Sequence, residues 1–151
     1  MKIQNQQIYW LMGFIKECPM NAKGNRMRRR FLDILEQKFE QYKVHRQELL
    51  EMYCAKDQDG NFKTKTEDGE LLYEIEDRQK YLLEFAELQT EYFYISEDDQ
   101  NEEMLRIMGE AFLKQDGLFS GMDAQYLNDV SEEFEKYFKK QGIEYNQFYL
   151  K

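Results

Sequence analysis

Residues 25–54, NRMRRRFLDILEQKFEQYKVHRQELLEMYC, form the longest segment with a regular apolar pattern. Apart from a polar segment at 45–47, apolar residues recur along it at the spacing of one helix face, at Phe31, Leu35, Phe39, Tyr42, Leu49 and Tyr53. This pattern predicts a single helix over 25–54, long enough to be the central helix of the fold.

Further helices are predicted on both sides of it. Apolar spacing indicates helices over 4–17, which Pro19 ends, and over 76–89, 97–114 and 121–141. We expect Ser96 to cap the helix at 97–114 and Gly142 to cap the end of the last one. Segment 61–75 contains a Gly turn and predicts a small hairpin, while 92–95 is strand-like and 143–151 is an aromatic tail. The chain is therefore expected to be mostly α, a single domain over 1–151 with about five helices.

The composition of the 151 residues excludes several classes of protein. A balance of 21 Lys and Arg against 30 Asp and Glu gives a net charge of −9, which disfavours binding to nucleic acid or anionic membranes. The longest apolar run, residues 8–15, is too short to span a bilayer, and no signal peptide is recognisable. Two cysteines, Cys18 and Cys54, fit free thiols in a reducing cytoplasm. The sequence thus predicts a soluble protein of the cytoplasm.

Groups that support catalysis are scarce. The single histidine, His45, lies within the long predicted helix, where we expect it on the surface, so no catalytic triad is available. Cys18, His45 and Cys54 lack the short ligand pairs of a zinc site. The glycines are scattered, and we expect them in caps and turns instead of a phosphate-binding loop. The sequence therefore predicts no enzyme, no cofactor and no metal.

Residues 57–61 resemble the start of a calcium loop. Asp57, Asp59 and Asn61 occupy the first three ligand positions, but Phe62 stands where a sharp turn needs Gly and Asp68 where the last ligand is usually Glu. A turn in which Asp57 accepts hydrogen bonds from its own backbone explains the same residues, and we expect that turn.

Five cations crowd into eight residues at the start of the long helix, without one acid: Lys23, Arg26, Arg28, Arg29 and Arg30. Positive charge at a helix N-terminus opposes the helix dipole, so this cluster requires an explanation. Either the side chains pair with carboxylates of the same chain or a symmetry mate, or they form a docking site for a phosphate, a nucleotide or an acidic partner segment. We call these five residues the basic cluster.

Two further sets of residues are candidates for contact with a partner. The aromatic content, 15%, is high, and two segments exceed what a small helical core requires, so they are interpreted either as core or as interface: Tyr92 and Tyr94, then Tyr145, Phe148 and Tyr149. Carboxylates also gather at the predicted start of the helix at 97–114, at Asp98, Asp99, Glu102 and Glu103. This acidic face is explained by the helix dipole, and mimicry of a phosphate backbone or binding of a divalent ion are its alternatives.

Several motifs occur in a recognisable order: GNRMRRRF at 24–31, ILE at 34–36, ELLEMY at 48–53, KDQDGN at 56–61, NEEML at 101–105 and FSGMDA at 119–124. In these motifs the chain resembles, over nearly its whole length, the small proteins of the domain of unknown function 1617 family, encoded by tailed phages and prophages of Gram-positive bacteria. The resemblance implies a phage origin, no established activity and no catalytic residues to carry over. The family's Arg-x-Arg-x-Arg-Phe element falls on Arg26, Arg28, Arg30 and Phe31.

The sequence and the resemblance together favour a non-enzymatic phage accessory protein that binds a host or phage protein in the host cytoplasm. A more specific form of this hypothesis is an inhibitor of a host enzyme or defence complex that takes part in host takeover. The alternative is a virion-assembly or tail-associated component, a homo-oligomer formed through the apolar N-terminal helix around Trp10 and Phe14.

Overall fold

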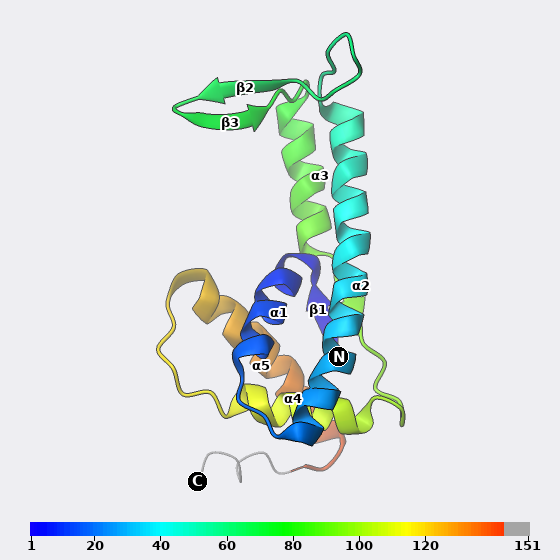
Figure 1. Ribbon diagram of the computed structural model, residues 1–151, viewed down its shortest axis with the longest axis vertical. Helices are drawn as coiled ribbons and strands as arrows, with labels where there is room; N and C mark the ends of the chain where they lie inside the picture. Colours follow the sequence, from blue (N-terminus) through cyan, green and yellow to red (C-terminus); the bar gives the residue numbers. More distant parts are fainter. Residues whose placement is uncertain (144–151) are drawn as a thin grey trace. The chain divides into compact units, whose positions relative to one another are not determined.

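The computed structural model describes residues 1–143, and it is mostly α, as predicted (Figure 1). Its α-helices are α1 (Ile8–Glu17), α2 (Ala22–Tyr53), α3 (Arg78–Thr90), α4 (Glu102–Leu113) and α5 (Gly121–Lys140). Its strands form two antiparallel pairs: β1 (Lys2–Gln4) with β4 (Tyr92–Tyr94), and β2 (Thr64–Glu67) with β3 (Glu70–Tyr73). The aromatic tail, apart from Ile143, lies outside the described residues. Within the described residues no helix has the length and apolar character needed to cross a membrane.

The chain divides into two compact units, where the sequence predicts a single domain. The first unit comprises residues 1–39 together with the chain from Tyr92 onward, and the second comprises Glu40–Glu91. The first division falls inside α2, which continues without interruption from Ala22 to Tyr53. A boundary within a regular helix has no Pro, Gly or linker to announce it, so the pattern of residues does not reveal it.

The core of the first unit is built from α1, the first half of α2, α4 and α5. Its largest fully buried side chains include Phe31, Phe112, Phe134 and Phe138. The sequence predicts glycines in caps and turns, but Gly13, Gly24 and Gly109 lie inside α1, α2 and α4 instead. Gly109 is the one that the packing of two helices requires. A Cβ at this position would stand 2.6 Å from Phe138 Cζ and 2.8 Å from Phe134 Cδ1. Only glycine therefore permits this approach of α4 to α5.

The β1–β4 pair explains one wrong helix boundary. Ile3 pairs with Phe93, and both are buried, so residues 2–4 form a strand. A 3-10 turn over Asn5–Gln7 follows, in which the Gln4 amide donates to Gln7 Oε1 at 3.0 Å. The first helix thus begins at Ile8, not at Gln4.

The predicted start of the fourth helix is also wrong, by five residues. Asp98 accepts hydrogen bonds from the Ser96 hydroxyl and from the amides of Gln100 and Asn101, which makes a turn ahead of α4. Asn101, not Ser96, is the residue at the N-cap. At the C-terminal end of α5, the cap expected at Gly142 is confirmed. Gly142 has φ +67°, and its amide donates to the carbonyl of Lys139.

The second unit consists of α2 from Glu40 onward, the β2–β3 hairpin and α3. The hairpin turns through Asp68 and Gly69, both with positive φ, as the Gly-containing turn predicts. In the helix pair, the Tyr53 ring packs edge-on against Tyr81 at 6.0 Å. The buried hydrophobic residues of this unit are few, namely Tyr42, Leu50, Tyr53, Cys54 and Leu88.

Candidate functional site

The basic cluster lies in the first turns of α2, and its cations have partners in the same chain. Lys23 forms an ion pair with Glu103, and Arg29 Nε lies 3.0 Å from Asp33 Oδ1. Both pairs are exposed, so each contributes little to stability. Arg30 Nη2 donates to the carbonyl oxygen of Gln100 at 2.8 Å.

Arg28 has the most specific role in the cluster. Its Nη1 lies 3.3, 2.9 and 2.8 Å from the carbonyl oxygens of Ile15, Lys16 and Cys18. The last carbonyls of a helix have no partner within the helix, so the guanidinium caps the C-terminus of α1. Within residues 1–143, Arg26 donates to the Ala22 carbonyl of its own helix, at 3.4 Å. These contacts favour the intramolecular alternative for the cluster, and its docking role stays a prediction.

The two aromatic candidates that the structure describes lie on β4. Tyr92 and Tyr94 are exposed on either side of the buried Phe93, with 48% and 71% of their surfaces accessible. Lys2 Nζ lies 4.4 Å from the centre of the Tyr92 ring, and Gln4 donates to the Tyr92 hydroxyl. Tyr145, Phe148 and Tyr149 lie outside the described residues.

The acidic face is exposed and is partly used by local contacts. The hydrogen bond from Ser96 and those from the backbone lower the pKa of Asp98, and the hydrogen bond from Lys23 lowers the pKa of Glu103. Asp98 therefore shapes the turn before α4, and Glu103 anchors a member of the basic cluster. Asp99 and Glu102 are exposed.

The groups considered for catalysis or metal binding are dispersed. His45 lies on the surface of α2 as predicted, with 57% of its side chain exposed. Cys18 and Cys54 are buried thiols, and burial raises the pKa of both. Asp57 Oδ1 accepts from the amides of Asp59 and Asn61, each at 2.9 Å, which confirms the predicted turn. Among residues 1–143 no three His, Cys, Asp or Glu side chains are arranged to hold a metal ion.

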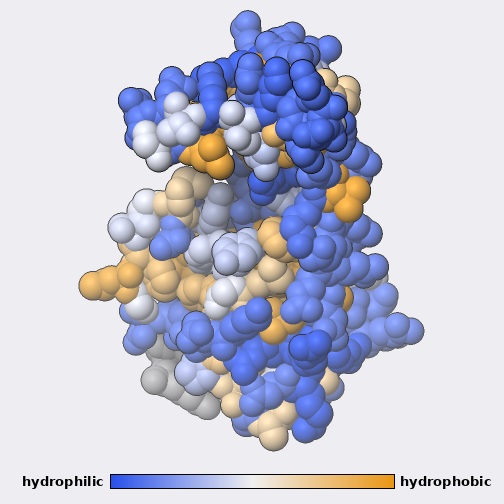
Figure 2. All heavy atoms as spheres, turned by 45° about the horizontal axis from the view of Figure 1, so that its top comes forward, coloured by the Kyte–Doolittle hydropathy of each residue, from blue (hydrophilic) through white to orange (hydrophobic). Residues whose placement is uncertain are grey.

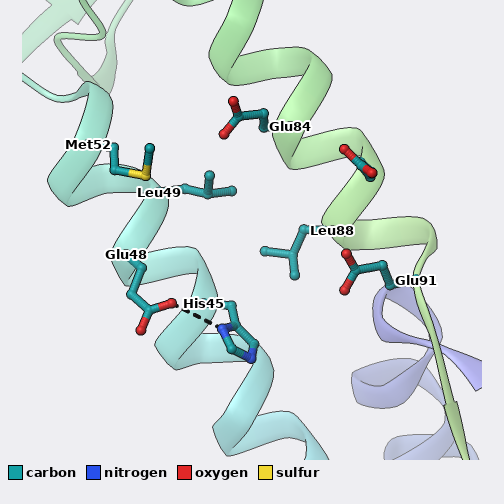
Figure 3. A pocket seen from close by; sticks show the side chains of 8 residues that line it. His45, Glu48, Leu49, Met52, Glu84, Leu88 and Glu91 are labelled. Atoms are coloured by element: carbon teal, nitrogen blue, oxygen red, sulfur yellow. Dashed lines mark hydrogen bonds and ion pairs between the residues drawn. The ribbon is translucent and has the colours of Figure 1, made fainter.

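An open groove of about 470 Å³ runs between α2 and α3 within the second unit (Figure 3). Each helix side contributes four residues at positions i, i+3, i+4 and i+7: His45, Glu48, Leu49 and Met52 from α2, and Glu84, Glu87, Leu88 and Glu91 from α3 and the residue after it. Residues with this spacing share one helix face. Leu49 and Leu88 point toward one another across the groove. We call it the α2–α3 groove.

The charges along this groove have one sign. Glu48 Oε2 lies 3.1 Å from His45 Nδ1, and Glu84 accepts a hydrogen bond of 2.6 Å from the Tyr53 hydroxyl, which raises the pKa of Tyr53. Glu87 and Glu91 are exposed, and neither has an ion-pair partner among residues 1–143. The lining thus carries four carboxylates and neither Lys nor Arg.

A second cavity, of about 520 Å³, lies in the first unit and is lined by Tyr94 among others. Its two carboxylates already have partners, since Lys140 pairs with Glu97 and Lys136 with Glu133, and Lys2 and the Met1 amine add further positive charge to the lining. The α2–α3 groove differs from this cavity, because its lining holds four carboxylates and no Lys or Arg beside them.

The sequence places Leu49 on the apolar face of the long helix and His45 on its surface. It does not indicate that Glu84, Glu87 and Glu91 belong to a binding site. A signal was present, because Glu84, Glu87 and Glu91 follow the same spacing around Leu88. Such a pattern resembles an ordinary solvated helix face until α2 is placed beside it. No protein-family model matches the chain, and no curated protein and no solved structure is significantly similar to it.

Proposed function

We propose that this protein is a non-enzymatic phage accessory protein that acts by binding a host or phage protein. The observation that carries the proposal is the exposure of apolar residues in the second unit. Seven of its large hydrophobic side chains are exposed, compared with five buried hydrophobic residues: Val44, Met52, Leu71, Leu72, Tyr73, Leu82 and Leu83. On the face in Figure 2, hydrophobic patches interrupt a mostly hydrophilic surface. Leu72, Tyr73 and Leu82 line one shallow cavity together, and exposed apolar residues that lie side by side are typical of a contact with another protein.

The distribution of charge supports the same unit as the binding element. Residues 40–91 contain 14 Asp and Glu and seven Lys and Arg, a balance of −7 out of −9 for the whole chain. A concentrated negative charge speeds association with a basic partner and repels acidic ones. This supports the sharper form of the proposal, an inhibitor that occupies a basic surface of a host enzyme or defence complex. The phage origin itself depends on the family resemblance.

The alternative, a virion-assembly or tail-associated component, requires a homo-oligomer formed through the helix around Trp10 and Phe14. Those rings pack within the first unit: Trp10 stacks on Phe14 at 5.1 Å, and Phe14 contacts Phe112 at 4.8 Å and Phe119 at 5.7 Å. Much of the apolar surface that this alternative needs is therefore covered by the chain itself.

The test is to capture a C-terminally tagged chain from Gram-positive cells during phage infection, with mass spectrometry of what accompanies it. The matched variants are Leu71→Lys with Leu83→Lys in the second unit and Leu118→Lys with Met122→Lys in the first, all at positions at least 58% exposed. We expect one stoichiometric protein that the first variant loses and the second retains. Recovery of the chain in purified virions, or a partner that both variants retain, would contradict the proposal.

A further inference from the structure

The α2–α3 groove has an apolar centre. Leu49 is half-buried, Leu88 is buried and Met52 is 66% exposed, so apolar atoms remain accessible between the helices. Apolar side chains that enter such a groove are stabilised by the surface removed from water. This centre calls for a ligand with apolar side chains of its own.

The length of the groove fits two turns of a helix. Residues 45–52 and 84–91 each cover seven steps, about 10 Å at 1.5 Å per residue. An amphipathic helix presents apolar anchors at i, i+3, i+4 and i+7 over the same distance, which is how helices are bound in grooves between helices. The occupant that fits the geometry is therefore a helical segment.

The charge of the groove identifies the polar part of this segment. Glu48 stands on α2, and Glu84, Glu87 and Glu91 stand on the α3 side, so carboxylates lie on both edges of the apolar centre. Lys and Arg that flank the apolar anchors would meet them, and Glu87 and Glu91 have no ion-pair partner in the described chain. A second copy of this chain is disfavoured as the source, because the basic cluster is already bonded within its own molecule.

We infer that the α2–α3 groove binds an amphipathic helix of the partner protein whose apolar side chains are flanked by Lys and Arg. This inference rests on the proposed function, since it names the chemistry of the partner. It makes Leu49 and Leu88 the apolar contacts and the four glutamates the source of charge specificity.

The test uses a fluorescein-labelled helical peptide of about 18 residues, built from Leu, Lys and Ala, with the leucines at i, i+3, i+4 and i+7. Its controls are a peptide of the same composition with the leucines dispersed around the helix and a peptide with Glu in place of Lys. Fluorescence anisotropy measures binding to the full chain.

Two protein variants change the net charge equally: Glu87→Lys with Glu91→Lys at the groove, and Glu17→Lys with Glu36→Lys, exposed residues of the first unit. The two changes at the groove place cations near the C-terminal end of α3, where the helix dipole favours them.

We expect the amphipathic Lys peptide to bind, and the groove variant to weaken it about tenfold or more, while the variant in the first unit retains nearly full affinity. A substitution at the apolar centre, Leu49→Ser, is expected to weaken the peptide as well, with circular dichroism to verify folding. Equal weakening by both charge variants, or equal binding of the dispersed peptide, would overturn the groove as the site.

The capture experiment stays independent of the peptide measurement. A partner lost by Leu71→Lys with Leu83→Lys but retained by the groove variant would refute this inference and leave the proposed function standing.

Discussion

Arg28 shows how hydrogen bonds can offset the unfavourable placement of a positive charge near the N-terminus of a helix. Its guanidinium binds three carbonyl oxygens at the end of α1, an interaction that the sequence could not reveal because the partners are backbone atoms 10 to 13 residues away. The pattern of residues indicated that the basic cluster needs partners, and it pointed to carboxylates. Lys23 and Arg29 follow that prediction, whereas Arg28 and Arg30 bind carbonyls.

Arg28→Met keeps much of the aliphatic side chain and removes the donors. We expect it to lower the free energy of unfolding by about 1–3 kcal/mol, the cost of leaving carbonyl groups without their partner. Arg26→Met, at an exposed position of the same cluster, is the control and should change stability by less than about 0.5 kcal/mol. Urea denaturation followed by circular dichroism measures both, and equal losses would remove the capping role from Arg28.

Glu97 makes stability depend on pH. Burial alone would raise the pKa of this carboxyl, but bonds from the Met1 amine and from Lys140 outweigh it and lower the pKa overall. The unfolded chain has the ordinary value, about 4.3. The stabilising contribution is thus complete above this value and is lost as the pH falls through the lower pKa of the folded state. We expect urea denaturation to give a larger free energy of unfolding for the wild type than for Glu97→Gln, and this difference to shrink below about pH 4. A difference that stays constant as the pH falls would contradict this.

At the scale of elements, the patterns with strong periodicity were predictable and the short contacts were not. The long helix over 25–54 is observed as Ala22–Tyr53, and the helix over 121–141 as Gly121–Lys140. β1 was missed because three residues carry too little pattern, and its strand conformation depends on β4, some 90 residues later. The groove was missed for the same reason, since it needs two distant helix faces beside each other.

The contact between α4 and α5 provides a test of one such unpredicted feature. Gly109→Ala would place a Cβ against the buried rings of Phe134 and Phe138, and we expect a loss of about 1–3 kcal/mol from overpacking. Gly13→Ala in α1 has no atom within 4 Å of its new Cβ and should instead stabilise the chain by about 0.5–1 kcal/mol. Thermal unfolding of both variants compares them directly, and a stable Gly109→Ala protein would show that the rings can move aside.

At the scale of the whole molecule, the two units differ in how much core they possess. The buried hydrophobic cluster lies entirely in the first unit, whereas the second has five buried hydrophobic residues. Local opening is easiest where buried apolar contacts are few. We expect amide hydrogen exchange in α3 and the β2–β3 hairpin to be faster than in α4 and α5, and uniform exchange across the chain would mean that the units unfold as one.

A partner bound to the second unit would supply the apolar contacts that this unit lacks. The sequence indicated binding surfaces at the basic cluster and at the tyrosines, but seven of the 13 exposed large hydrophobic residues in the described part of the chain, and most of the net charge, lie within residues 40–91. Hydrogen exchange of the chain, free and in complex with the protein captured during infection, tests whether the partner binds the second unit. We expect new protection in residues 45–52 and 84–91 of the complex. Protection confined to the basic cluster and to β4, with the groove unchanged, would contradict it.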